Sequence, residues 1–407
     1  MELDRRALLE LAGAGAAVSM GATAGCLDTV GLDDGTGDGG QGDGDGRGVP
    51  AYARWVSWDE ENDGTFYAYV DWKGLSELDD FDAGAELNGS VGEAGSTDGG
   101  ELDDESVFEH DDPMLALPSV SILIVALGAG FGLVGTGLSG LLSPADGADD
   151  EADENTSETD FGMGETTAAD FESAVEAVLM VNDAFVLVGD VDTDEIDDTL
   201  TEPPESEWGF KTVYEQTDEI GEFVVYEPAD DGEDENSFSM VQDHAIAVSA
   251  DAIVFTTGDE ATDAIDDVRG PIEAAAGDGK RAADENDDVA WMLEAAGHGH
   301  VAFGGYGDFD DETDAADGTG EMEIDPEGTG EFEELDGARG VVASLTIDGE
   351  SESTGELAAV FDELDDEAKA TIEEEFGSSA DDVSHDVGDD RVTVSATWNE
   401  DVVAEDP

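Results

Sequence analysis

The sequence predicts an α+β fold with mainly antiparallel sheets and packed helices, joined by acidic disordered linkers and carrying one long glycine-rich hydrophobic helix or hairpin. Three observations predict it. Short segments that alternate aromatic or β-branched residues with others recur along the chain, some in pairs joined by short turns. Other segments place apolar residues at helical spacing. Stretches of Asp, Glu, Gly, Ser and Thr separate these patterned segments.

The elements of the first half are predicted from local patterns. Residues 51–58 and 65–72 are expected to be strands joined by a short loop. A helix is expected where apolar residues recur at helical spacing, at Phe171, Val175, Val178 and Leu179. The continuous apolar run at 184–189 predicts a strand. A short helix at 192–200 follows, because Asp192 with Glu195 three residues later is a capping-box arrangement.

The second half adds a series of strands and three helices. Strands are predicted at residues 211–214, 222–226, 244–249, 251–257, 300–306, 340–347 and 391–398. Helices are predicted at residues 259–275 (interrupted at Gly270-Pro271), 287–296 and 356–376. The strands at 244–249 and 251–257 are separated by one residue, which predicts a tight hairpin.

These elements group into units separated by acidic linkers. The structured units expected are a β-hairpin unit at 49–81, a hydrophobic segment at 114–143, an α+β domain at 169–306 and a C-terminal α+β unit at 338–400. The linkers expected between them are residues 82–113, 144–168 and 307–337, and residues 401–407 form a tail.

The net charge of the chain is extreme and limits the classes of partner that it can bind. Asp and Glu number 109 against 12 Lys and Arg, so the formal net charge is -97. In molar salt the Debye length falls to about 3 Å, which screens the self-repulsion that such a charge causes. We therefore interpret the carboxylates as a hydrated coat suited to high salt. No basic patch is present to neutralise phosphates, so nucleic acid is excluded as a partner.

The first 26 residues have the layout of an export signal. Arg5 and Arg6 precede a run of small and apolar residues that ends in Thr23-Ala24-Gly25-Cys26. Paired arginines indicate the twin-arginine route. A Gly- and Asp-rich stretch at 27–48 follows and is expected to be a flexible tether.

This N-terminal segment resembles the twin-arginine signals of haloarchaeal lipoproteins. The resemblance implies that Cys26 becomes the lipidated first residue of the mature protein, and that membrane lipid is a partner. One lipid chain holds a protein weakly, so firm anchoring needs a second chain or a further contact. The expected location is the outer face of the cell membrane.

An uncharged stretch at 114–142 stands out in this acidic chain. Residues 119–142 would span about 36 Å as a helix, against a bilayer core of about 30 Å. Gly128 and Gly132 form a GxxxG pair, which lets helices approach closely in lipid. Three interpretations stay open: a transmembrane span, a glycine-hinged hairpin that dips into a membrane or a partner, and a buried hairpin in the core.

Candidate metal ligands are few. His298 and His300 lie two residues apart near a predicted strand, so both could face one side, as metal ligands need. The alternation Asp190, Asp192, Asp194 resembles the start of a calcium loop, but Glu195 stands where that loop needs glycine. A capped helix start explains these aspartates better.

Other catalytic or binding motifs are absent from the sequence. It contains no G-x-S-x-G elbow. The glycines at 128–137 have no strand before and helix after them and no following Lys, as a phosphate loop needs, and we expect no cofactor. The aromatic cluster at Trp55, Trp58, Tyr69 and Trp72 is either core or a platform for a sugar or a partner. Residues 245–306 also resemble, by pattern, a bacterial exported family of unknown function, in which a hairpin leads into two helices and a strand; that implies a fold and no activity.

Three functions are compatible with these observations. The one we favour is a non-enzymatic, salt-adapted surface lipoprotein that acts as a scaffold or binding module. The second is an integral membrane protein with a span at about 119–142. The third is an exported metal-dependent hydrolase that uses His298 and His300. The sequence alone leaves the ligand of each open.

Overall fold

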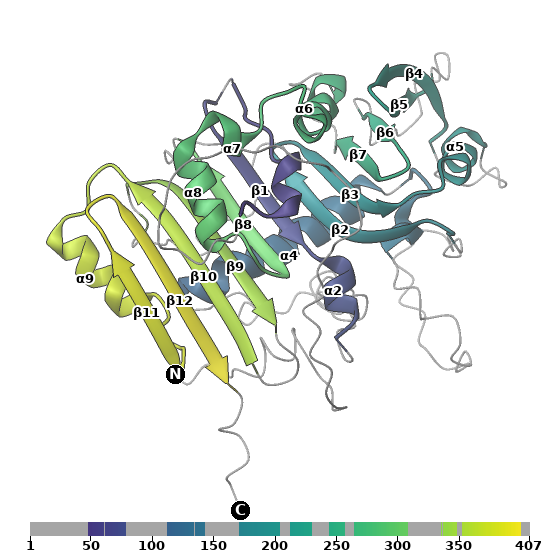
Figure 1. Ribbon diagram of the computed structural model, residues 1–407. Coiled ribbons are helices and arrows are strands. Elements are labelled where there is room, and N and C mark those ends of the chain that lie inside the picture. The colour runs from purple at the N-terminus through teal and green to yellow at the C-terminus, as the bar shows by residue number, and fades with distance from the viewer. Residues whose placement is uncertain are drawn as a thin grey trace, which may run out of the picture.

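The computed structural model is a mixed α+β fold built on one large antiparallel sheet (Figure 1). It describes residues 48–60, 62–78, 112–133, 135–142, 171–203, 212–229, 244–256, 264–307, 335, 337–347 and 352–399. The export signal with Arg5, Arg6 and Cys26, and most of the tether and the acidic linkers, lie outside these residues.

Twelve described strands form the sheet, in the order β11-β12-β10-β9-β8-β1-β2-β3-β7-β6-β5-β4. The strands are β1 (Thr65–Val70), β2 (Ala174–Val181), β3 (Ala184–Asp190), β4 (Tyr214–Ile220), β5 (Phe223–Pro228), β6 (Ile246–Val248), β7 (Ala252–Thr256), β8 (Val301–Tyr306), β9 (Ala338–Ile347), β10 (Glu352–Phe361), β11 (Asp382–Val387) and β12 (Arg391–Asn399). The sheet joins strands from three of the units that the acidic linkers separate in the sequence.

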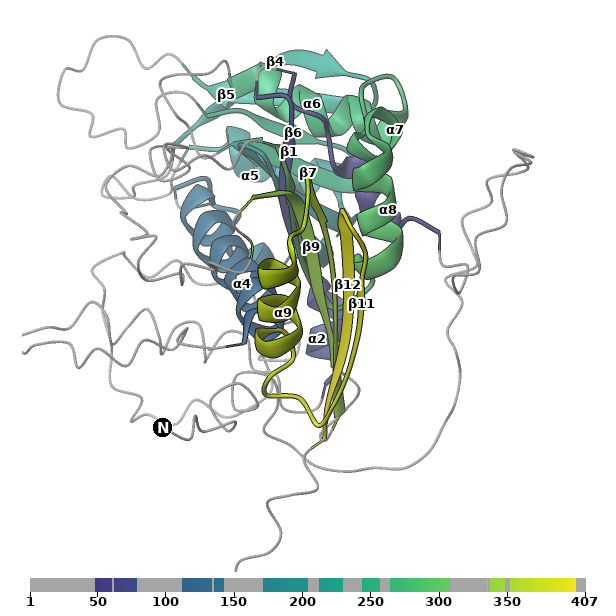
Figure 2. The same ribbon diagram turned by 90° about the vertical axis from the view of Figure 1, so that its left-hand side faces the viewer.

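Helices cover both faces of this sheet. They are α2 (Trp72–Ser76), α4 (Pro113–Gly132), α5 (Thr193–Thr201), α6 (Ala264–Ala276), α7 (Ala282–Glu285), α8 (Asp287–Ala296) and α9 (Asp366–Glu375), with 3₁₀ turns η1 (Ala51–Trp55) and η2 (Ser139–Leu142). Helices α4, α5 and α9 pack on one face, and η1, α6, α7 and α8 on the other. Figure 2 shows the sheet edge-on between α4 and α9 on one side and α7 and α8 on the other.

Because both faces are covered, central strands bury side chains in both directions. In β3, Val186 packs into the core under α6, whereas Phe185 and Leu187 pack into the core under α4. This explains why the predicted strand at 184–189 is a continuous apolar run with no polar alternation. The strands predicted at 65–72, 300–306, 340–347 and 391–398 are confirmed, as is the hairpin at 244–257.

The strand predicted at 211–214 overlaps β4 at Tyr214 alone, and three other predicted elements are wrong. Residues 51–58 form η1 instead of a strand, and residues 171–179 lead into β2 instead of a helix. In β2, Val178 and Leu179 are buried on opposite faces, so the apparent helical spacing is the pattern of a strand with two covered faces. The predicted helix at 356–376 is strand β10 followed by α9.

The strand β10 was missed for a related reason. Its sequence, ESTGELAAVF, is rich in good helix formers, yet Leu357 and Ala359 pack under α4 and α9 while Ala358 and Val360 pack on the opposite face. Tertiary burial therefore overrides local propensity here. Strand β11, which lies at the sheet edge with mostly exposed residues, had no apolar pattern to reveal it.

The order of the strands repeats outward from the central pair β1 and β8. β1 and β8 pair antiparallel, with Thr65 opposite Tyr306 and Val70 opposite Val301. Outward from them, β1-β2-β3 and β8-β9-β10 repeat the same order. Each run then leads through an N-capping aspartate, Asp192 or Asp365, into a helix and a hairpin. The hairpin β6-β7 is additional and lies between β3 and β5.

The uncharged stretch forms α4 and η2 and packs across the middle of the sheet. Helix α4 contacts β1, β2, β3, β8, β9 and β10. Its two serines are buried, and the Ser121 hydroxyl donates to the Ala302 carbonyl of β8 at 3.0 Å. By length and composition α4 is the one described helix that could cross a membrane, but most of it is buried against the rest of the fold. Of the helix or hairpin that the sequence predicts, the structure therefore has a helix, followed by a 3₁₀ turn.

The GxxxG glycines serve the contact between α4 and the sheet. A Cβ on Gly128 would lie 2.1 Å from the Phe185 ring of β3, so only glycine allows this approach. Gly132 is buried as well. Their predicted role in helix packing within a membrane stays a prediction.

Candidate functional site

The two histidines proposed as metal ligands have separate structural partners. The Nε2 atom of His298 lies 2.8 Å from the Gly48 carbonyl oxygen. Nδ1 of His300 accepts a hydrogen bond from the Ile347 amide at 3.1 Å. Within the described part of the chain, no group of three His, Cys, Asp or Glu side chains could hold a metal ion. A metal site on these histidines is thus unsupported.

The aspartate run at 190–194 caps a helix, as predicted. The Asp192 carboxylate accepts from the amides of Asp194 and Glu195 at the start of α5. In a capping box Glu195 would accept directly from the Asp192 amide. Here the Ser173 hydroxyl lies between them: it accepts from the Asp192 amide and donates to the Glu195 carboxylate. These groups satisfy a helix end and leave no cation site to propose.

The four aromatic residues at 55–72 do not form a platform. Trp55 is buried in the core, and Tyr69 stacks on Tyr52 with ring centroids 4.1 Å apart. Trp72 packs against the core on the α4 face. Trp58 lines a pocket.

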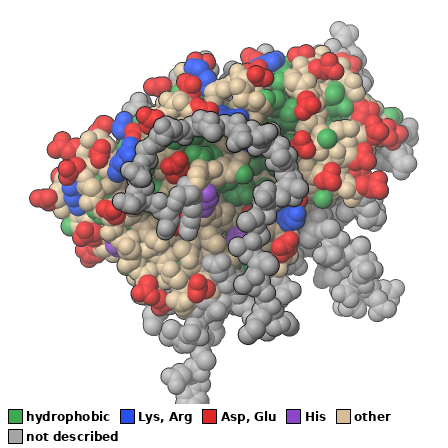
Figure 3. Space-filling model, viewed as in Figure 1, with side chains coloured by type: hydrophobic (Ala, Val, Ile, Leu, Met, Phe, Trp, Pro, Cys, Tyr) green, Lys and Arg blue, Asp and Glu red, His purple; other side chains and the backbone are tan. Residues whose placement is uncertain are grey.

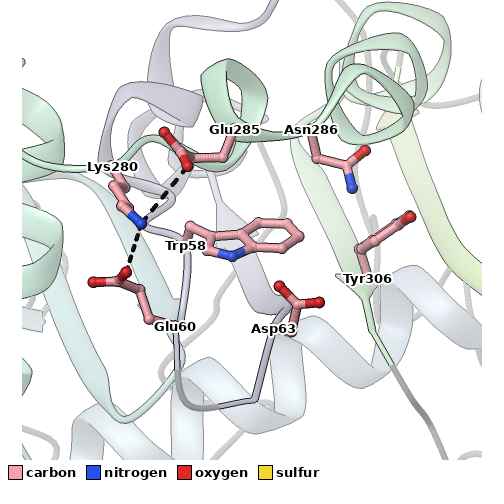
Figure 4. Close-up of a pocket in the computed structure, with 7 residues that line it drawn as sticks. All are labelled: Trp58, Glu60, Asp63, Lys280, Glu285, Asn286 and Tyr306. Atoms are coloured by element: carbon pink, nitrogen blue, oxygen red, sulfur yellow. Dashed lines mark hydrogen bonds and ion pairs between the residues drawn. The ribbon is translucent and has the colours of Figure 1, made fainter.

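That pocket lies where the loop before β1 meets the α7–α8 corner and the end of β8 (Figure 4). Its volume is about 350 Å³, and it is lined by Trp58, Glu60, Asp63, Lys280, Glu285, Asn286 and Tyr306. In Figure 4 the Trp58 ring lies centrally, with Lys280 and the two glutamates on one side and Asn286 and Tyr306 on the other.

The loop that carries Trp58 is held by backbone pairing. The Trp58 amide donates to the Lys280 carbonyl at 3.0 Å, and Asp59 and Gly64 exchange two hydrogen bonds. A Cβ on Gly64 would lie 2.3 Å from the Tyr306 carbonyl oxygen, so glycine lets the loop close onto β8. Asp63 adopts a positive φ of 48°, a conformation that Asp and Asn tolerate better than most residues. The pocket wall is therefore preformed.

The opposite wall comes from the corner between α7 and α8. Asn286 caps α8, because its Oδ1 accepts from the amides of Asp288 and Val289. The cap does not use its amide nitrogen, which leaves donor hydrogens for a ligand. Lys280 lies 2.5 Å from Glu60 and 3.8 Å from Glu285. The hydrogen bond with Glu60 raises the pKa of Lys280, so the amine stays charged.

Tyr306 is fixed from behind by a small ionic cluster. The Arg339 guanidinium lies over the Tyr306 ring at 5.8 Å from its centroid and donates to its hydroxyl at 3.1 Å. Asp288 holds Arg339 at 2.9 Å and Arg391 at 2.6 Å, and Arg391 lies over Trp291. This arrangement orients Tyr306 toward Trp58, with ring centroids 5.9 Å apart.

The face of the molecule in Figure 3 carries many Asp and Glu side chains and fewer Lys and Arg. In the lining, three carboxylates stand against one ammonium, which leaves two net negative charges. The available groups can stack on a ligand, accept hydrogen bonds and donate a few.

Sequence reasoning named Trp58 but missed the rest of this pocket. The lining comes from two segments more than 200 residues apart, 58–63 and 280–306. The pairing of β1 with β8 and the bridge between Ser57 and Arg281 bring these segments together. No local pattern at Tyr306 or Asn286 signals that contact.

Comparison with known proteins gives no further guide. No family model, no curated protein and no solved structure matches this chain.

Proposed function

We propose that this chain is an exported, salt-adapted surface lipoprotein whose folded body lies wholly outside the membrane and acts as a non-enzymatic binding module. The paired arginines, the small-residue run ending at Cys26 and the following tether support export and lipid attachment. The net charge of -97 supports a high-salt environment.

The pairing of β1 is the observation that carries the proposal. β1 precedes α4 in the chain, whereas its partners β2 and β8 follow it. If α4 crossed the membrane once, β1 and its partners would lie on opposite sides and could not pair. The packing of α4 across six strands, including β1, also gives it a role in the core. These observations favour an external body over a membrane-spanning protein.

A binding role fits the pocket better than a metal-dependent hydrolase does. The two candidate ligands have backbone partners near β8, and neither lines the pocket. The pocket instead offers aromatic and hydrogen-bonding side chains on a fixed frame.

Fractionation of cells in high salt tests the anchoring. The unaltered chain should sediment with membranes, and Cys26→Ser should appear in the medium, because removal of the lipid leaves only a folded body. The control Arg5→Lys with Arg6→Lys should keep the chain inside the cell. Membrane retention of Cys26→Ser at unchanged abundance would contradict the proposal and favour a span.

A further inference from the structure

The lining of the Trp58 pocket excludes several classes of ligand. Two net negative charges oppose phosphates, carboxylates and acidic sugars. Seven lining residues, five of them charged or amide-bearing, are a poor match for an apolar ligand, which needs a mainly hydrophobic cavity. What fits is a ligand with many hydrogen-bonding groups and at least one apolar face.

The placement of the polar groups favours hydroxyls over a cationic ligand. Glu60 and Glu285 are engaged by Lys280, and the charged amine itself faces the same space. A bound cation would have to approach that ammonium. A neutral hydroxyl can instead accept from Lys280 or Asn286 and donate to Asp63.

The aromatic side chains supply the apolar face. Trp58 and Tyr306 are both partly exposed, and their rings are tilted by 42° with centroids 5.9 Å apart. Tyr306 is held by Arg339, and the backbone of Trp58 is held by its hydrogen bond to Lys280 and by the Asp59–Gly64 bridge. Since these groups are held before a ligand arrives, binding costs less ordering entropy.

We infer that this pocket binds a neutral saccharide, with Trp58 stacking on the sugar ring and Asp63, Lys280 and Asn286 bonding its hydroxyls. The inference rests on the proposed binding function and names its ligand class. It does not depend on the lipid at Cys26.

Calorimetric titration of the full mature chain in 2 M KCl tests it, with neutral mono- and disaccharides (glucose, galactose, mannose, N-acetylglucosamine, maltose and cellobiose) as probes. At least one should bind saturably. Trp58→Ala should weaken that binding at least tenfold, because it removes the stacking surface. Asp63→Asn should weaken it several-fold, since Asn tolerates the same positive φ and removes only the charge.

Two controls separate binding from folding. Trp72→Phe, on the other face of the sheet, should bind as the unaltered chain does. Asp63 is exposed, so Asp63→Asn should keep the unfolding temperature even if Trp58→Ala lowers it. The inference is overturned if no saccharide in the panel binds, if Trp58→Ala and Asp63→Asn bind with unchanged affinity, or if choline or spermidine binds in place of sugars. Fractionation of Cys26→Ser reads out the anchoring separately.

Discussion

Two glycines two residues apart on α4 have opposite surroundings. Gly128 lies against Phe185 of β3, where a Cβ would overlap the ring, whereas a Cβ on Gly130 would meet nothing within 4 Å. Glycine is thus required by a close approach at position 128, whereas position 130 has room for a side chain. The sequence marks both as glycines of a possible membrane helix, and only the packing distinguishes them.

Alanine substitutions should separate these roles. Gly128→Ala should lower the free energy of unfolding by about 1–3 kcal/mol, because the ring of Phe185 must move. Gly130→Ala should be neutral or raise stability by up to about 1 kcal/mol, since alanine favours a helix and has room. Denaturant unfolding in high salt measures both, and equal effects would rule out this packing of α4.

His244 is a buried titratable group on the α4 side of the sheet. Its Nδ1 lies 2.8 Å from the Tyr214 hydroxyl, and its Nε2 has no hydrogen-bond partner in the structure as described. Burial lowers the pKa of His244 from 6.5 to about 4. The folded protein therefore keeps the imidazole neutral, whereas the unfolded chain takes up a proton below pH 6.5.

This difference predicts a pH-dependent loss of stability. Between pH 6.5 and 4.5 the free energy of unfolding should fall by about 2–3 kcal/mol through His244, because protonation favours the unfolded chain. In His244→Gln this loss of the free energy of unfolding should be absent. The loss that comes from protonation of the carboxylates should remain. The measurement is the difference in the free energy of unfolding between the two proteins at each pH in molar salt. A difference that does not change with pH would show that His244 is not buried in its neutral form.

At the scale of elements, α4 is fixed to the C-terminal half by one buried carboxylate. Asp112 is 3% exposed and caps α4 through the Met114 amide at 3.1 Å. It also accepts from the amides of Gly377 and Ser379 and from the Ser379 hydroxyl, just after α9. Because this buried carboxylate accepts hydrogen bonds from the start of α4 and from the segment after α9, its replacement should lower the free energy of unfolding.

Asp112→Asn should therefore lower the free energy of unfolding by about 2 kcal/mol or more, since an amide nitrogen would face backbone donors. Asp192→Asn is the matched control. It caps the exposed start of α5, where Asn serves as well as Asp, so stability should barely change. Thermal unfolding of the two variants provides the comparison, and a neutral Asp112→Asn would argue against this link.

Local patterns predicted elements well where one signal dominated. The Asp192 cap, the apolar run of β3 and the periodic helix α8 are examples. They failed where burial on both faces hid the period of a strand, as in β2 and β10. Trp58 was visible in the sequence as one aromatic of four, but its partners Tyr306 and Asn286 depend on long-range pairing that no local pattern encodes.

At the scale of the molecule, one sheet unites segments that acidic linkers separate in the sequence. Its two halves repeat one order of strands and helix about the β1–β8 pair, and α4 crosses both. Since β1 precedes α4 and the other described strands follow it, the sheet and a single membrane crossing by α4 exclude each other. We therefore expect the whole sheet to lie on one side of the membrane.

Protease treatment of intact cells in high salt, followed by mass spectrometry of released and retained fragments, tests whether the sheet lies on one side. Cleavage in the tether should release peptides from 48–78 and from 171–399 together into the medium. Retention of 171–399 with the cells while 48–78 is released would contradict the account, because it would place the two sides of α4 in different compartments.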